Sequence, residues 1–167
     1  MIEVTVAQLG VDRATNSPVV ILRERDGARV LPIWIGPAEA SAIAMELQGV
    51  KFQRPLTHDL LKQVIVGLGG ELKHVLIRAV QENSYFAELL IRRGEDVFQV
   101  DARPSDSIAL ALRLHSPIFA SDGLLGDAGD GPGDRGEPSS GAPDDAADAL
   151  KRYLEQLDPE DFGKFTP

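Results

Sequence analysis

Residues 97–114 read VFQVDARPSDSIALALRL, an apolar run that enters a polar junction and leaves it as a second apolar run. The first run favours a strand and the second a helix, so the junction at residues 101–107 lies between them. Pro104 suits the first turn of a helix, because that turn does not need the missing backbone N–H. Ser105 or Asp106 can cap the free N–H groups that follow. We therefore expect a strand, a capped turn and a helix in direct succession.

The same junction gathers groups that can bind an anion. Within seven residues it holds the carboxylates of Asp101 and Asp106 and the guanidinium of Arg103. Helix capping explains Ser105, but it does not explain Asp101 or Arg103. A helix start beside clustered acidic and basic groups marks a candidate site for an anion or a phosphoester.

Length and composition fit one globular domain. The chain has 167 residues, of which 43% are hydrophobic, and no apolar run is long enough to span a bilayer. It contains no cysteine, which excludes disulfides and thiolate metal sites. The N-terminus lacks the pattern of a signal peptide, so we expect a cytoplasmic protein with no membrane partner.

The net charge of −9 is unevenly distributed along the chain. Residues 1–121 hold 13 basic and 14 acidic side chains, whereas residues 122–149 hold one basic and eight acidic ones. The segment 122–143 is rich in Gly, Pro and Asp without apolar periodicity, which predicts a flexible acidic linker. Residues 144–167 are expected to form a C-terminal helix and tail, with one helix face formed by Leu150, Tyr153, Leu154 and Leu157.

Residues 1–121 are predicted to form an α+β domain, an antiparallel or mixed sheet with helices packed on it. Strands are expected over residues 2–6, 19–22, 30–35, 73–80, 85–91, 97–101 and 116–120. Helices are expected over residues 38–48, 57–68 and 108–114, the last with Pro104 in its first turn. Pro32 indicates an edge strand or a bulge, and Trp34 is expected to anchor packing rather than to stack on a nucleobase.

A second polar cluster, RPLTHD at residues 54–59, precedes the predicted second helix. Thr57 is expected to be its N-cap, which places His58 in the first turn. There His58 could act as a base or a metal ligand, or it could simply face solvent. Glu39, in the first turn of the preceding helix, could compensate the helix dipole or supply a further functional carboxylate.

Three segments of this chain resemble the bifunctional nuclease domain family. They are LPIWIGPAEA at residues 31–40, RPLTHDL at residues 54–60 and DARPSDSIALALR at residues 101–113. They occur in the family's order, and the likeness covers roughly residues 1–125. The resemblance implies nuclease activity on both DNA and RNA, as described for plant members, and therefore a nucleic acid partner.

Positions that match the family's polar motifs can be given roles in phosphodiester cleavage. The candidate catalytic residues are His58, Asp59, Asp101, Arg103 and Asp106, with His58 as general base or acid. The candidates for phosphate binding are Thr57, Arg103 and Ser105, with Arg103 as a bidentate clamp. The candidates to hold Mg²⁺ or Mn²⁺ through oxygen ligands are Asp101, Asp106 and Glu39.

Two other interpretations stay open. Arg103 with Asp101, or Arg54 with Asp59, could form buried ion pairs that fix strand–helix corners. Alternatively, the chain could be a non-catalytic binding or regulatory module for an anionic ligand or a protein partner. Whichever function applies, we expect a homo-oligomer, with a dimer as the expected state, that assembles through the alanine-rich helix and the C-terminal helix.

Overall fold

Seven strands form one mixed sheet in the computed structural model, which describes residues 1–81 and 84–126. The strand order is β3-β2-β1-β7-β4-β5-β6, and every neighbouring pair is antiparallel except β4 and β7. β3 is an edge strand, as Pro32 predicted. The strands are β1 (Ile2–Asp12), β2 (Ser17–Glu24), β3 (Val30–Trp34), β4 (Glu71–Gln81), β5 (Ser84–Arg93), β6 (Asp96–Ala102) and β7 (Ile118–Ala120).

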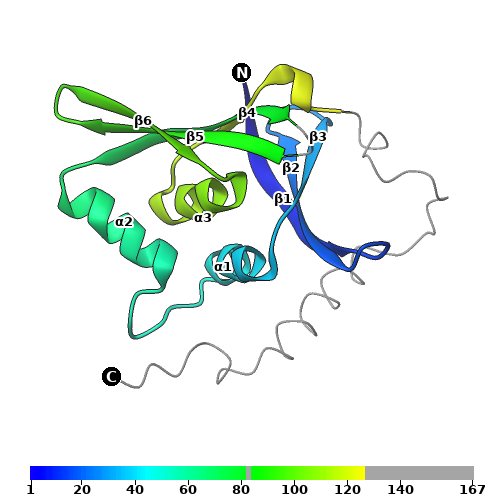
Figure 1. The fold of residues 1–167 in the computed structure, drawn as a ribbon, viewed down its shortest axis with the longest axis horizontal. Helices are drawn as coiled ribbons and strands as arrows, with labels where there is room; N and C mark the ends of the chain where they lie inside the picture. The colour runs from blue at the N-terminus through cyan, green and yellow to red at the C-terminus, as the bar shows by residue number, and fades with distance from the viewer. Residues whose placement is uncertain (82–83, 127–167) are drawn as a thin grey trace.

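The helices lie together on one side of this sheet (Figure 1). In the described residues they are α1 (Pro37–Leu47), α2 (Thr57–Gly67) and α3 (Pro104–Leu114), followed after β7 by the short 3-10 helix η1 (Asp122–Leu124). α3 contacts α1, α2, β4 and β5, and its Ile108 is completely buried, as are Val75 and Ile77 of β4. This arrangement confirms the predicted α+β class.

β1 continues well past its predicted end at residue 6. A β-bulge between Val6 and Gln8 shifts the register of β1 against β2. Strict alternation from the buried Val4 would turn even-numbered residues to the core. The extra residue of the bulge shifts this pattern, so the odd-numbered Leu9 is buried as well. The alternation at residues 2–6 therefore breaks without ending the strand.

The alanine-rich face of α1 is covered by the chain itself. Ala40, Ala42 and Ala44 are buried, and α1 packs against α3. This face therefore cannot join two subunits in the way the sequence suggested. Large apolar side chains are exposed instead on α2, on the residue after it and on β6: Leu60, Leu61, Val64, Val66, Leu68, Val97, Phe98 and Val100.

Residues 122–126 belong to the folded domain and not to the predicted linker. Arg29 Nη1 donates to Asp122 Oδ1 at 2.8 Å, Leu125 is buried, and Gly126 pairs with Val30. The rest of the predicted linker and the predicted C-terminal helix lie outside the described residues. No helix within residues 1–81 and 84–126 is both long and apolar enough to cross a membrane.

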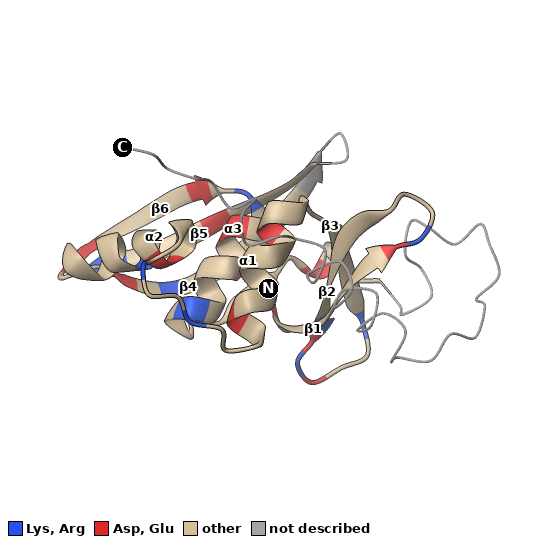
Figure 2. Cartoon of the chain, turned by 90° about the horizontal axis from the view of Figure 1, so that it is seen from below, with Lys and Arg blue, Asp and Glu red and all other residues tan. Residues whose placement is uncertain are grey.

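Acidic and basic residues are interspersed on the helix side of the molecule (Figure 2). This agrees with the near balance of 13 basic and 14 acidic side chains over residues 1–121. An anionic ligand would therefore be held by individual side chains and not by a broad basic face.

Candidate active site

The first turns of three helices contribute to one group of charged side chains, here named the charge cluster. Glu39 lies in the first turn of α1, His58 in the first turn of α2, and Arg103 and Asp106 at the start of α3. Because α3 packs against both α1 and α2, these first turns come within reach of one another. The two polar segments that the sequence singled out are therefore brought together.

Asp106 connects the members of the charge cluster. Its Oδ1 lies 2.9 Å from His58 Nε2, and its Oδ2 accepts a hydrogen bond from Arg103 Nε at 2.7 Å. Arg103 Nη1 in turn forms an ion pair with Glu39 Oε1 at 2.9 Å. An ionised carboxylate only accepts hydrogen bonds, so His58 Nε2 carries a proton whenever Asp106 is ionised.

The charge cluster ranges from nearly buried to well exposed. The His58 side chain is 13% exposed, whereas the Arg103 side chain is 66% exposed. Arg103 therefore presents its charge to solvent while Glu39 and Asp106 hold its guanidinium from within. A guanidinium oriented in this way can form paired hydrogen bonds to a phosphate.

Asp106 is ionised at neutral pH. Burial alone would raise the pKa of Asp106, but hydrogen bonds from Arg103 and His58 outweigh burial and hold that pKa below its ordinary value. The same hydrogen bond to Asp106 is the main reason why the pKa of Arg103 is raised. The ion pair between Arg103 and Asp106 therefore persists over the whole neutral range.

A cavity of about 340 Å³ opens beside the exposed end of the charge cluster. Glu39 and Arg103 line this cavity together with Trp34, Tyr85 and Ser105. His58 and Asp106 do not line this cavity. Asp106 is connected to it only indirectly, because it accepts a hydrogen bond from Arg103, which does line the cavity. We name it the aromatic cavity.

Trp34 is not the packing anchor that the sequence suggested. It lies at the end of β3 and is 37% exposed, and its Nε1 donates to Asp12 Oδ2 at 2.9 Å. The indole ring is thus held by one hydrogen bond and still offers a free surface to the aromatic cavity.

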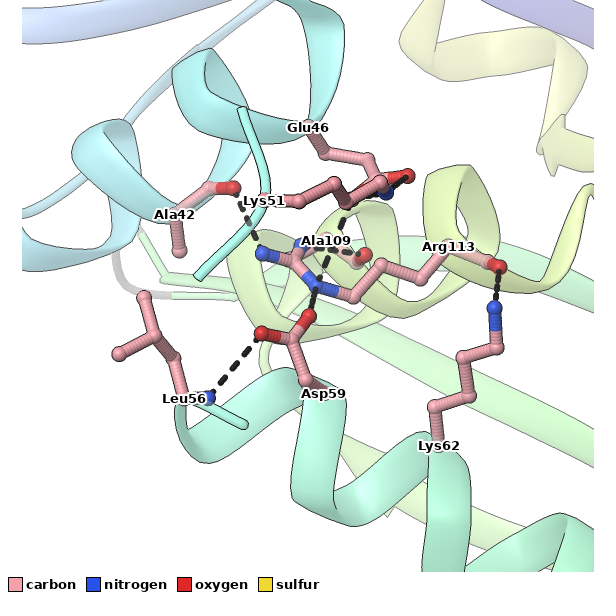
Figure 3. A network of polar contacts seen from close by, with 8 residues as sticks. All are labelled: Ala42, Glu46, Lys51, Leu56, Asp59, Lys62, Ala109 and Arg113. Atoms are coloured by element: carbon pink, nitrogen blue, oxygen red, sulfur yellow. Dashed lines mark hydrogen bonds and ion pairs between the residues drawn. The ribbon is translucent and has the colours of Figure 1, made fainter. Parts of the chain in front are cut away.

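Asp59 belongs to a different network from the charge cluster (Figure 3). Its Oδ1 accepts from Arg113 Nε at 2.7 Å, and Arg113 is only 3% exposed. Arg113 also donates to the backbone oxygens of Ala109 and Ala42, so this network ties α1, α2 and α3 together from within. The interpretation of a buried ion pair therefore applies to Asp59, with Arg113 as its partner in place of Arg54.

Thr57 is exposed and is not the N-cap of α2. The helix begins at Thr57, so Leu56 holds the N-cap position. The other carboxylate oxygen of Asp59, Oδ2, accepts from the Leu56 N–H at 3.0 Å, which satisfies a backbone donor at this helix end. Asp59 thus stabilises the turn that carries His58 without contacting the charge cluster.

Asp101 lies on the opposite face of the sheet from the charge cluster. It pairs with Glu88 between β6 and β5, and Ala87, the neighbour of Glu88, is buried on the helix side. Because successive side chains of a strand alternate between faces, Glu88 and Asp101 point away from the helices. The side chain of Asp101 makes no hydrogen bond or ion pair with any other described residue. The structure therefore does not bring it together with Arg103 or Asp106.

The carboxylates of the charge cluster, as they are arranged, do not form a binding site for a divalent cation. Within the described residues, no three His, Asp or Glu side chains gather closely enough to hold a metal ion. Glu39 and Asp106, two predicted ligands of Mg²⁺ or Mn²⁺, share the guanidinium of Arg103 instead. Arg103 thus supplies the positive charge at this position.

Two residues of these sites were not predicted from the sequence. Arg113 is the one charged side chain in the apolar run at residues 108–114, and a charge on a core-facing helix is itself a signal of a buried partner. Tyr85 carried no such signal, because its position beside Arg103 depends on the pairing of β5 with β6.

The sequence pattern of the bifunctional nuclease domain matches residues 20–130 of this chain. A protein of Mycobacterium tuberculosis named only as uncharacterized is 43% identical over 162 residues, which are 96% of this chain and 97% of that protein. Bifunctional nuclease 2 of rice is 30% identical over 112 residues, which are 65% of this chain and 34% of the plant protein. Bifunctional nuclease 1 of Arabidopsis thaliana is 27% identical over 105 residues. The chain belongs to the bifunctional nuclease domain family.

Proposed function

We propose that this protein is a nuclease that hydrolyses phosphodiester bonds in DNA and RNA, with the charge cluster as its active site. The observation that carries the proposal is the contact between His58 and Asp106, which joins a proton-transfer group to the exposed guanidinium of Arg103. Relatives that are named bifunctional nucleases support the same reaction class.

His58 is the group that moves the proton. In hydrolysis, a water oxygen forms a bond to phosphorus and the bond from phosphorus to the leaving oxygen breaks. Because Nε2 of His58 faces Asp106, the opposite ring nitrogen, Nδ1, takes the proton from water and then returns it to the leaving oxygen. Asp106 keeps the ring in one orientation, as the carboxylate does in hydrolytic triads.

Arg103 stabilises the charge on the phosphoryl group. Its exposed guanidinium can donate to two phosphoryl oxygens, where negative charge gathers during the reaction. Glu39 and Asp106 fix the guanidinium before the substrate arrives, so little ordering is required when it binds. The first-turn N–H groups of α3 add a second, weaker attraction for the anion.

The direct test is cleavage of single-stranded DNA and RNA by the purified full chain, with and without added Mg²⁺ or Mn²⁺. We expect His58→Ala to lower the rate by about 100- to 10,000-fold, the usual contribution of general acid–base catalysis. The matched control is His74→Ala, because the His74 ring packs edge-on against Phe119 of β7 and takes no part in the charge cluster. Equal rates for His58→Ala and the parent protein would overturn the proposal.

A non-catalytic assembly module is the second candidate, favoured by the apolar side chains exposed around α2 and on β6. β6 is also an edge strand, so its outer backbone groups have no strand partner in the described sheet. A second copy of the chain could cover both surfaces. Sedimentation equilibrium should then show a dimer that Leu68→Lys dissociates, whereas a monomeric parent protein would remove this candidate.

A further inference from the structure

The aromatic cavity has features that the proposed hydrolysis does not use. It lies where the end of β3, the start of β5 and the start of α3 meet. Its volume of about 340 Å³ lies within the range of sites that hold a small organic ligand. Two aromatic side chains, Trp34 and Tyr85, line it on the sheet side, and Arg103 and Ser105 line it on the helix side.

The aromatic residues offer apolar area at fixed positions. Trp34 keeps more than a third of its surface exposed, and its ring is oriented by the hydrogen bond to Asp12. Tyr85 packs partly against the core, and burial raises the pKa of its hydroxyl, which therefore remains a donor at neutral pH. Such rings bind flat groups by stacking at a low cost in side-chain entropy.

The helix side of the aromatic cavity offers groups for a single anion. Ser105 is 7% exposed and lines the cavity, and its hydroxyl makes no hydrogen bond with another described residue. Among the described residues no fully buried side-chain polar atom lacks a hydrogen-bond partner, so the Ser105 hydroxyl is open to the cavity and can bond to a ligand there. Arg103 lines the same wall, but Glu39 and Asp106 both pair with it and offset its charge, so the wall offers hydrogen-bond donors to one phosphate and little attraction to a polyanion.

We infer that the aromatic cavity binds one unpaired nucleotide, with the base against Trp34 and Tyr85 and a phosphate on Arg103 and Ser105. The inference rests on the proposed function and names its substrate class, which is single-stranded DNA or RNA. In a duplex, both faces of each base are covered by its neighbours, so a base reaches an aromatic wall only after it leaves the stack. Paired strands therefore bind this site poorly.

The fluorescence of Trp34 measures occupation of the cavity directly, because Trp34 is the only tryptophan of the chain. The probes are a short oligothymidylate, its ribose counterpart, an abasic oligonucleotide of equal length, the same sequence as a duplex, and thymidine monophosphate. We expect quenching by both single strands and little by the duplex. The abasic strand should bind more weakly, by roughly 5- to 150-fold, because it lacks the stacking contribution of the base.

Substitutions in β5 separate stacking from folding. Tyr85→Leu should weaken binding of the oligothymidylate, measured by fluorescence anisotropy, by roughly 5- to 150-fold, and Tyr85→Phe should retain most of the affinity. The matched control is Phe86→Leu, because Phe86 is the next residue of the strand, is exposed and points to the other face of the sheet. Trp34 emission and thermal unfolding show whether each variant is folded.

The outcomes distinguish this inference from the proposed nuclease activity. The nucleotide site would be overturned, and the nuclease activity left intact, by three results together. The protein would cleave nucleic acid without quenching of Trp34, would bind the abasic strand as tightly as the oligothymidylate, and would bind equally well after Tyr85→Leu. Quenching by single strands without cleavage would support the site and count against the nuclease. Binding of thymidine monophosphate without binding of either oligonucleotide would overturn the assignment to single strands.

Discussion

His58 Nε2 lies 2.9 Å from Asp106 Oδ1, although 48 positions of sequence separate the two residues. The contact exists because α2 and α3 pack against each other with their first turns close together. It couples an imidazole, which can exchange protons, to a carboxylate that also holds an exposed guanidinium. The reactivity of this site therefore depends on Asp106 more than on any other carboxylate nearby.

Asp106→Asn should abolish most of the activity without unfolding the protein. The amide keeps the shape of the side chain but removes the charge that orients His58 and Arg103, and we expect a rate loss of about 100- to 10,000-fold. Cleavage assays and circular dichroism check this. Asp101→Asn is the matched control, because Asp101 lies on the opposite face of the sheet; a comparable loss in that variant would contradict the site described above.

Removing the guanidinium should increase the affinity of the charge cluster for divalent cations. In the parent protein, Arg103 occupies both Glu39 and Asp106, so a cation must displace it. Arg103→Ala leaves two carboxylates without that partner, and we expect tighter Mn²⁺ binding by titration calorimetry. Equally tight binding in the parent and the variant would place the ion at another position.

The ion pair between Asp59 and Arg113 should matter for stability. Asp59→Ala removes the nearer of the two carboxylates that face the buried guanidinium, the other being Glu46 at 3.9 Å, and we expect this to cost about 2 kcal/mol in the free energy of unfolding. The double variant Asp59→Leu with Arg113→Met should recover much of that loss, because apolar side chains of similar size can replace a buried pair. Chemical denaturation measures both effects.

A surface pair provides the control for this experiment. Glu71 and Arg92 form an ion pair at 2.9 Å in which both side chains are more than half exposed. Glu71→Ala should change the stability by less than about 1 kcal/mol, as is usual for such pairs. A loss as large as that of Asp59→Ala would show that the burial of Arg113 is not the cause.

Stability should fall when the solution becomes acidic. The pKa values of Asp59 and Asp106 are lowered in the folded protein from an ordinary value of 3.8, so below that value the unfolded chain binds more protons than the folded one. Their stabilising contribution is complete above the ordinary value and is lost as the pH falls through the lowered values. Urea denaturation over the acidic range should show this slope, and Asp59→Asn should reduce it.

Binding of nucleic acid should depend only weakly on salt. Basic and acidic residues are interspersed on the helix side, and the charge cluster offers one exposed guanidinium (Figure 2). With roughly one or two phosphates neutralised, the logarithm of the binding constant should fall with the logarithm of salt concentration with a slope near −1. A slope of about −4 or steeper would show a basic surface beyond Arg103.

Local sequence patterns predicted where the helices begin, whereas tertiary packing decided which side chains from different elements contact one another. The turn around Pro104 is encoded within a few residues, so the sequence was sufficient for it. The closeness of His58 and Asp106 could only be a hypothesis, because it depends on how α2 packs on α3.

Two of the misplaced residues, Asp101 and Trp34, lie on strands, and the sheet determines where they point. Asp101 and Ala102 are adjacent in β6, so their side chains point to opposite faces, and the pairing of Ala102 with the buried Ala87 puts Asp101 on the face away from the helices. Trp34 is the last residue of the edge strand β3, and part of its indole ring is exposed. Neither register nor edge exposure can be read from the composition of a short segment.

The position of β7 has a consequence for how the protein is made. β7 is the last strand of the described chain, yet it lies in the middle of the sheet, between β1 and β4. While a ribosome is still synthesising residues 118–120, the strands already made form two groups, β1–β3 and β4–β6, that no strand pairing joins, and the edges of β1 and β4 that β7 will cover are open. Completion of the sheet must therefore await release of almost the entire domain, and a nascent chain stalled earlier would expose two unpaired strand edges that other chains or chaperones can bind.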